Sequence, residues 1–156
     1  MKTALIAVVC FACGFAAQEA KETLEFDFER PAFAADGIGT IAIHFMAAKD
    51  GFSSNVNLIA QPFAGTMEAY DQISMKEFEQ MGLTVIEKTN TDGVLRYHYK
   101  GVQNGLPLRF FSKAVQVDNR VYLATATTLQ KEWETVSQEL VRSVESFELK
   151  EAPAVN

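Results

Sequence analysis

Cysteine is nearly absent from this chain of 156 residues, which holds only Cys10 and Cys13. Because both lie close to the N-terminus, residues 17–156 have no thiol for a disulfide bond, a redox reaction or metal binding. Apolar residues make up 48% of the sequence, and a chain of this length buries a core large enough to fold without covalent cross-links.

Histidine and dense positive charge are also scarce. A zinc site usually takes three or four Cys or His ligands, so His44 and His98 could hold a metal only together with a carboxylate. A Ser–His–acid triad would need one of the same two histidines, and no G-x-S-x-G motif is present. The net charge of −6, without a long basic run, argues against nucleic-acid binding. We therefore expect no enzyme activity and no cofactor.

The N-terminus has the pattern of a secretory signal peptide. Lys2 precedes a short apolar run over residues 4–12, and the small residues Gly14 and Ala16 mark a cleavage site before Ala17. The apolar run is shorter than the roughly 20 residues that a transmembrane helix needs.

Residues 1–16 are thus expected to be removed, and the protein to be exported to the periplasm or secreted, with no transmembrane segment in the mature chain. We expect one domain over residues 17–149, since domains commonly have roughly 100–150 residues, and a loose tail over residues 150–156. A lipoprotein anchored through Cys13 is the alternative, although Cys10 stands where such signals normally have leucine.

The first half of the mature chain predicts three strands and a helix. Residues 24–28 (LEFDF) alternate strictly between apolar and acidic, and residues 40–46 and 55–60 are further strand candidates. A helix is expected to begin after an N-cap at Thr66 and to end before Gly82.

The second half predicts a meander of four strands over residues 83–127, followed by a second helix. The meander turns are Asp92-Gly93, Asn104-Gly105 and Asp118-Asn119. The second helix is expected to run from a cap at Thr128 to about Ser146. Its apolar stripe is Leu129, Trp133, Val136, Leu140, Val144 and Phe147.

Connections between successive strands are too short for parallel crossovers, which need about a dozen residues or more. The sequence therefore predicts an α+β fold with a largely antiparallel sheet of about six or seven strands and two main helices.

The order of these elements resembles PsbP-like domains, particularly the bacterial DcrB-like group, over roughly residues 24–149. The stretches that carry the resemblance are FSSNVN (52–57), a helix with Tyr70, GLTV (82–85), Arg96-Tyr97, Gly101, Gly105, YLATAT (122–127) and SFEL (146–149). The resemblance implies an α/β/α sandwich and a non-enzymatic role. Relatives include a photosystem subunit, a Ran-binding protein and chaperone-like adaptors, so the resemblance selects no partner and supplies no site residues.

No Asp or Glu occurs from Gly93 to Val117, although the chain carries 20 acidic residues. Closing the hairpin at Asn104-Gly105 brings six side chains, here called the basic strip, onto one face of the sheet. The basic strip comprises Arg96, His98, Lys100, Arg109, Phe111 and Lys113. The opposite face carries Leu95, Tyr97, Tyr99, Leu108 and Phe110.

The basic strip predicts a binding surface for an acidic protein surface or an anionic ligand. The alternative is an ordinary solvated face, neutralised by acids of neighbouring elements such as Glu87. We expect an exported, non-catalytic binding or accessory protein whose partner is an envelope or secreted protein, in an oligomeric state left open.

Two other functions remain open at this point. One is a carrier of a small apolar or anionic ligand, with a pocket between sheet and helices lined by Tyr97, Tyr99, Phe110 and Trp133. The other is an unrecognised hydrolase that would depend on His98.

Overall fold

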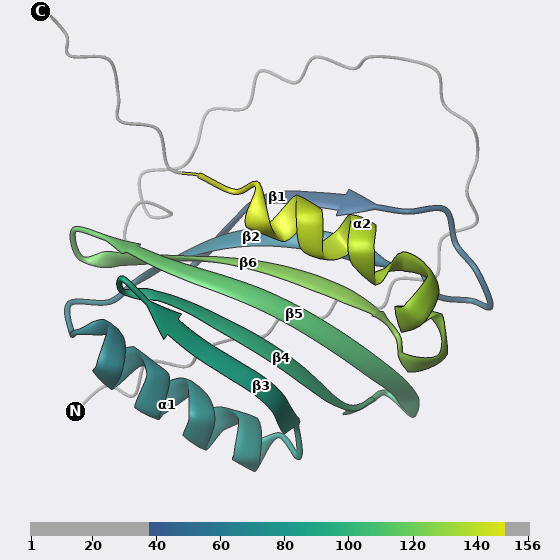
Figure 1. Ribbon diagram of the computed structural model, residues 1–156, viewed down its shortest axis with the longest axis horizontal. Coiled ribbons are helices and arrows are strands. Elements are labelled where there is room, and N and C mark those ends of the chain that lie inside the picture. Colours follow the sequence, from purple (N-terminus) through teal and green to yellow (C-terminus); the bar gives the residue numbers. More distant parts are fainter. Residues whose placement is uncertain (1–37, 149–156) are drawn as a thin grey trace, which may run out of the picture.

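The computed structural model describes residues 38–148, which form one antiparallel sheet with two α-helices and one short 3-10 helix (Figure 1). The strands are β1 (Gly39–Phe45), β2 (Asn55–Pro62), β3 (Thr84–Thr91), β4 (Val94–Gln103), β5 (Leu106–Val117) and β6 (Arg120–Leu129). The helices are α1 (Met67–Gln80), the short 3-10 helix η2 (Gln130–Glu132) and α2 (Trp133–Glu145).

The sheet has six strands in the order β1-β2-β6-β5-β4-β3. Each neighbouring pair is antiparallel, and β3 to β6 form the predicted meander. The predicted α+β fold is therefore confirmed. The expected signal peptide (1–16), the strand candidate at 24–28 and the tail (150–156) lie outside the described residues.

Local sequence explains the ends of α1. The Thr66 hydroxyl accepts a hydrogen bond from the amide of Ala69, which satisfies one of the free N–H groups of the first turn. Gly82 follows the helix with φ of +67°, a conformation that favours glycine. The predicted cap and stop of this helix are both confirmed.

Two tight turns set the register of the meander. Asp92-Gly93 and Asn104-Gly105 have positive φ at both residues, as two-residue type I′ turns require. Such turns match the twist of the flanking strands, so each hairpin has one favoured alignment. The predicted pairing of β4 with β5 follows from the second turn.

Aromatic side chains fill the layer between the sheet and α1. Tyr97, Tyr99 and Phe110 are each at most 1% exposed. Phe78 of α1 stacks on Tyr99 with ring centroids 4.5 Å apart, and Tyr99 stacks on Phe110 at 4.8 Å. This stacked cluster forms the larger core.

Helix α2 covers the opposite face of the sheet (Figure 1). Its buried residues Leu140 and Val144 pack over Ala124 and Ala126 of β6, and Phe111 lies beside them. The small alanine side chains let the helix approach the sheet closely. One helix on each face gives the expected α/β/α sandwich.

The predicted start of the second helix is wrong. Thr128 does not cap a helix: it lies fully buried in β6, opposite Arg109, and its hydroxyl is 2.7 Å from that of Ser54. Threonine is favoured in strands as well as at helix N-caps, and here the strand continues to Leu129. Helix α2 begins only at Trp133.

Replacing the α1 cap should lower stability by a small, defined amount. We expect Thr66→Ala to reduce the free energy of unfolding by about 1 kcal/mol, because the hydrogen bond to the amide of Ala69 is lost. Thr66→Ser keeps the hydroxyl and should stay close to wild type. Urea denaturation measures both, and equal losses in the two variants would contradict the capping role.

Candidate functional site

The basic strip lies on the face of the sheet that α2 covers. Its predicted register is confirmed: Arg96 is opposite Lys113, His98 opposite Phe111, and Lys100 opposite Arg109. The strip therefore runs along neighbouring β4 and β5, and its two ends meet different parts of α2.

At one end, two cations hold the C-terminus of α2. Arg96 donates to both carboxylate oxygens of Glu145, at 2.6 and 3.0 Å. The ammonium of Lys113 donates to the backbone carbonyls of Glu145 and Phe147, at 2.8 and 3.0 Å. Carbonyls of a last helical turn have no partner within the helix and carry partial negative charge. Since Lys113 is only 8% exposed, this end is an internal anchor.

The acid that neutralises this end is Glu145, a residue that the sequence reasoning did not single out. Its hydrogen bond with Arg96, followed by the charges of Arg96 and Lys113, lowers the pKa of Glu145 below its usual value. Partial burial acts in the opposite direction. Glu145 comes directly after Val144 of the apolar stripe. Only the tertiary packing shows that the Glu145 side chain reaches β4.

At the other end, His98, Arg109 and Trp133 form a compact cluster. The imidazole of His98 stacks on the Trp133 indole with centroids 4.6 Å apart, and the Arg109 guanidinium lies 5.7 Å from the centroid of the Trp133 ring. Arg109 Nη1 donates to His98 Nε2 over 3.1 Å, so the imidazole is neutral in this contact. Burial and the charge of Arg109 lower the pKa of His98.

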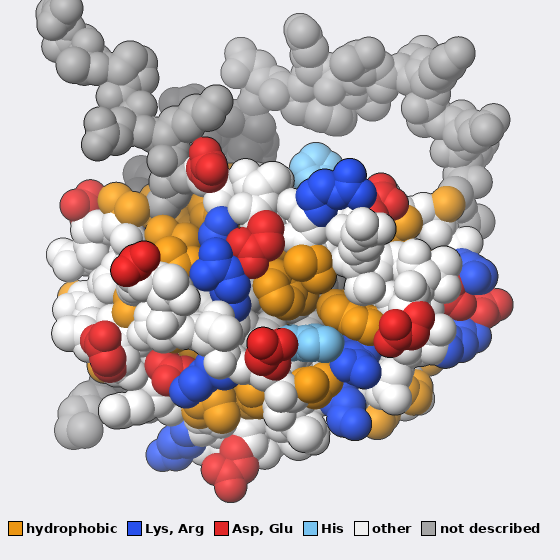
Figure 2. All heavy atoms as spheres, viewed as in Figure 1, with side chains coloured by type: hydrophobic (Ala, Val, Ile, Leu, Met, Phe, Trp, Pro, Cys, Tyr) orange, Lys and Arg blue, Asp and Glu red, His pale blue; other side chains and the backbone are white. Residues whose placement is uncertain are grey.

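Lys100 is the most available cation of the strip. It is half-buried, and within residues 38–148 no carboxylate lies within ion-pair distance of it. Helix α2 packs mainly on β6, β5 and β2, which leaves β3 and the outer part of β4 without a helix on this face (Figure 1). Figure 2 shows basic and acidic side chains interspersed over this side.

The structure contradicts the predicted ligand pocket between the sheet and the helices. Tyr97, Tyr99 and Phe110 are packed tightly against α1, whereas Trp133 lies on the opposite face beside His98. The expected pocket combined residues from the two faces of the sheet: Trp133 is buried on α2 together with Leu140 and Val144, and α2 lies on the face opposite α1. Tyr97, Tyr99 and Phe110 are residues of the hydrophobic core.

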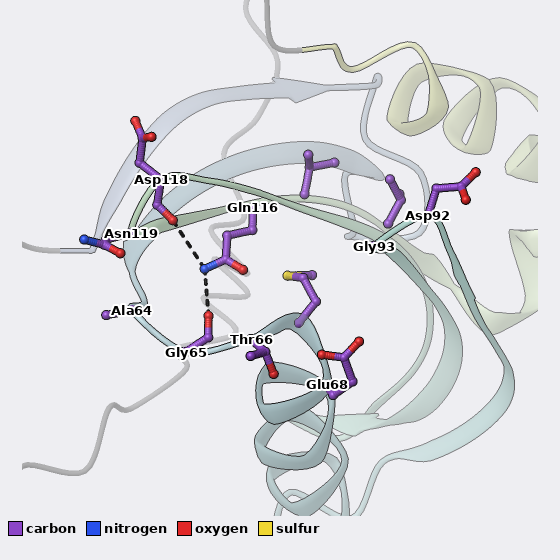
Figure 3. Close-up of a pocket in the computed structure, with 12 residues that line it drawn as sticks. Ala64, Gly65, Thr66, Glu68, Asp92, Gly93, Gln116, Asp118 and Asn119 are labelled. Atoms are coloured by element: carbon purple, nitrogen blue, oxygen red, sulfur yellow. Dashed lines mark hydrogen bonds between the residues drawn. The ribbon is translucent and has the colours of Figure 1, made fainter.

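An open hollow of about 610 Å³ lies where α1 begins, beside the β3–β4 and β5–β6 turns (Figure 3). The Gln116 amide spans part of it and donates to the carbonyls of Gly65 at 2.9 Å and Asp118 at 3.4 Å. The N-terminus of a helix attracts anions, but the carboxylates of Glu68, Asp92 and Asp118 oppose them. The sequence did not indicate this hollow, because its residues come from separate turns.

The two histidines of the described part of the chain lie far apart in the sheet. His44 lies on β1 and His98 on β4, with β2, β6 and β5 between these strands. Residues 38–148 contain no group of three or more His, Cys, Asp and Glu placed to hold a metal ion. No helix described here is long and apolar enough to span a bilayer.

Neither a family model nor a curated protein sequence matches the chain. Among solved structures, PA94 of Pseudomonas aeruginosa, a protein of unknown function described as a candidate regulator, aligns with a TM-score of 0.59 at 13% identity, over 78% of this chain and 88% of PA94. CyanoP, the PsbP protein of Synechocystis sp. PCC 6803, gives 0.48 at 11% identity over 79% and 98% of the chains. LpqN of Mycobacterium tuberculosis, involved in cell envelope biogenesis, gives 0.42 at 10% identity over 70% and 80%.

The likeness to PA94 shows a shared fold over most of both chains. At this level of identity the comparison concerns the arrangement of strands and helices. It transfers no partner and no site residue to this chain.

The anchor on α2 predicts a pH-dependent stability. We expect Glu145→Gln to lower the free energy of unfolding at pH 7 by about 1 kcal/mol, since the two-point hydrogen bond to Arg96 becomes weaker and the ion pairs with Arg96 and Lys113 are lost. The pKa of Glu145 is lowered in the folded protein, so its contribution is complete above the usual value of 4.5 and is lost as the pH falls through the folded value.

Urea unfolding of both proteins at several pH values measures this effect. The gap between wild type and Glu145→Gln should narrow below pH 4.5. Glu139→Gln, an exposed change on the same helix, serves as the control and should shift stability by less than about 0.5 kcal/mol. A gap that stays constant down to acidic pH would contradict the anchor.

Proposed function

We propose that the protein is an exported, non-catalytic accessory protein that binds an acidic surface of another envelope or secreted protein. The contact is made by the open end of the basic strip, defined as Lys100, Arg109 and His98. The observation that carries this proposal is the pairing of Lys100 directly opposite Arg109 with no carboxylate bonded to either within residues 38–148.

Two like charges facing each other across strands destabilise a sheet slightly. At the anchored end of the strip, the carboxylate of Glu145 compensates this repulsion. Among the described residues, no carboxylate forms an ion pair with Lys100 or Arg109. Carboxylates of a partner would offset the repulsion and accept from Arg109, which favours an acidic surface.

The surroundings of the open end favour binding over catalysis. His98 is stacked on Trp133, and its Nε2 is occupied by Arg109, so this nitrogen is not free to take a proton from a substrate. The rigid aromatic support holds Arg109 in place, which reduces the entropy lost on binding. The proposal of export rests on the N-terminal sequence pattern alone.

Charge reversal at Lys100 tests the proposed contact. We expect Lys100→Glu to lower capture of partners from the native cell envelope at least tenfold, since it replaces an attractive charge with a repulsive one in a desolvated contact. Arg96 and Lys113 are unsuitable for this test, because their exchange would release α2.

Lys76→Glu is the matched control, with the same change of charge on the exposed side of α1. Quantitative mass spectrometry of proteins retained by the tagged wild type and by both variants provides the measurement. The proposal holds if Lys76→Glu retains the same proteins as wild type while Lys100→Glu loses them. Equal retention by all three proteins would refute a role for the open end.

A further inference from the structure

Among residues 38–148, strand β1 forms an edge of the sheet with no strand paired on its outer side, and it carries no charged side chain apart from His44. Its exposed large apolar side chains are Ile41, Ile43 and Phe45, at 54%, 37% and 54%. The other edge strand, β3, carries Glu87 and Lys88, the kind of residue that normally protects a sheet edge from further pairing. An apolar, uncharged edge with free backbone groups is suited to receive another strand.

The register of β1 with β2 assigns its side chains to the two faces. Ile43 and Phe45 pair with Asn57 and Asn55 and share the face on which α1 lies, whereas His44 pairs with Val56 on the face of α2. A strand that completes this edge needs apolar side chains toward the α1 face. Acidic side chains on its other face would lie next to His44.

We propose that this edge is covered by the chain's own residues 24–28. The sequence LEFDF has this alternation, with Leu24, Phe26 and Phe28 on one face and Glu25 and Asp27 on the other. An antiparallel alignment that sets Phe26 opposite Ile43 also sets Leu24 opposite Phe45 and Glu25 opposite His44. Leu24 and Phe26 then each meet an apolar neighbour, which stabilises cross-strand pairs.

The connection to β1 favours this occupant over a strand from another molecule. Residues 29–38 join the segment directly to the start of β1, and Pro31 ends the run of residues able to pair in a sheet. A short linker holds the segment near β1 at an effective concentration in the millimolar range. A separate partner or a second copy would have to compete with this tethered segment.

Disulfide trapping tests the proposed pairing in the full chain. Cys10→Ser and Cys13→Ser remove the native thiols, and Phe26→Cys with Ile43→Cys then supplies the pair. Mild oxidation should give an intramolecular disulfide, because directly opposed residues of antiparallel strands lie close enough for one. The matched control is Phe26→Cys with Ile86→Cys, which uses a slightly more exposed position on the far edge, in β3.

The proposal holds if the Ile43 pair cross-links within one chain and the Ile86 pair does not. Cross-links only between chains would show that a second copy covers β1, and no cross-link would show that residues 24–28 are elsewhere; either result overturns the proposal.

Maleimide labelling gives an independent readout. The thiol introduced by Ile43→Cys should react severalfold faster once Phe26→Asp is added, whereas one introduced by Val102→Cys should be unaffected. An unchanged rate at position 43 would also overturn the proposal.

Discussion

The turn at Asn104-Gly105 fixes how β4 and β5 align, and the rest of the molecule depends on this register. It sends Tyr97, Tyr99 and Phe110 to α1 and the basic strip to α2. A slip by one residue would exchange the two faces and bury the charged side chains in the aromatic core. Burying unpaired charges is costly, so only one register is compatible with both helices.

The two ends of the basic strip have different roles. The end with Arg96 and Lys113 is used inside the molecule, where it joins α2 to the sheet through Glu145 and the last helical carbonyls. The end with Lys100 and Arg109 has no such partner among the described residues, which is the basis of the proposed binding role. An apparent excess of positive charge in a sequence is therefore a poor measure of the charge available to a partner.

Local rules predicted much of this fold, because its turns and caps are encoded in a few neighbouring residues. Asp92-Gly93, Asn104-Gly105 and Thr66 have the residue types that their backbone conformations require. The errors concern positions where two local rules compete. A threonine such as Thr128 is favoured both at a helix N-cap and in a strand. Pairing with the neighbouring strand β5 places it in β6. The grouping of Trp133 with Tyr97 and Tyr99 is a separate error, since α2 and α1 lie on opposite faces of the sheet.

The site was harder to predict, since its partners are distant in sequence. The pairing of Arg96 with Glu145 spans 49 residues, and no periodic pattern indicates it. Trp133 is the sole tryptophan of the chain, so its nuclear Overhauser contacts test this account most directly. We predict contacts from the indole to the ring of His98 and the side chain of Arg109. Contacts to Tyr97 or Tyr99 would place α2 on the other face and contradict the division of the basic strip.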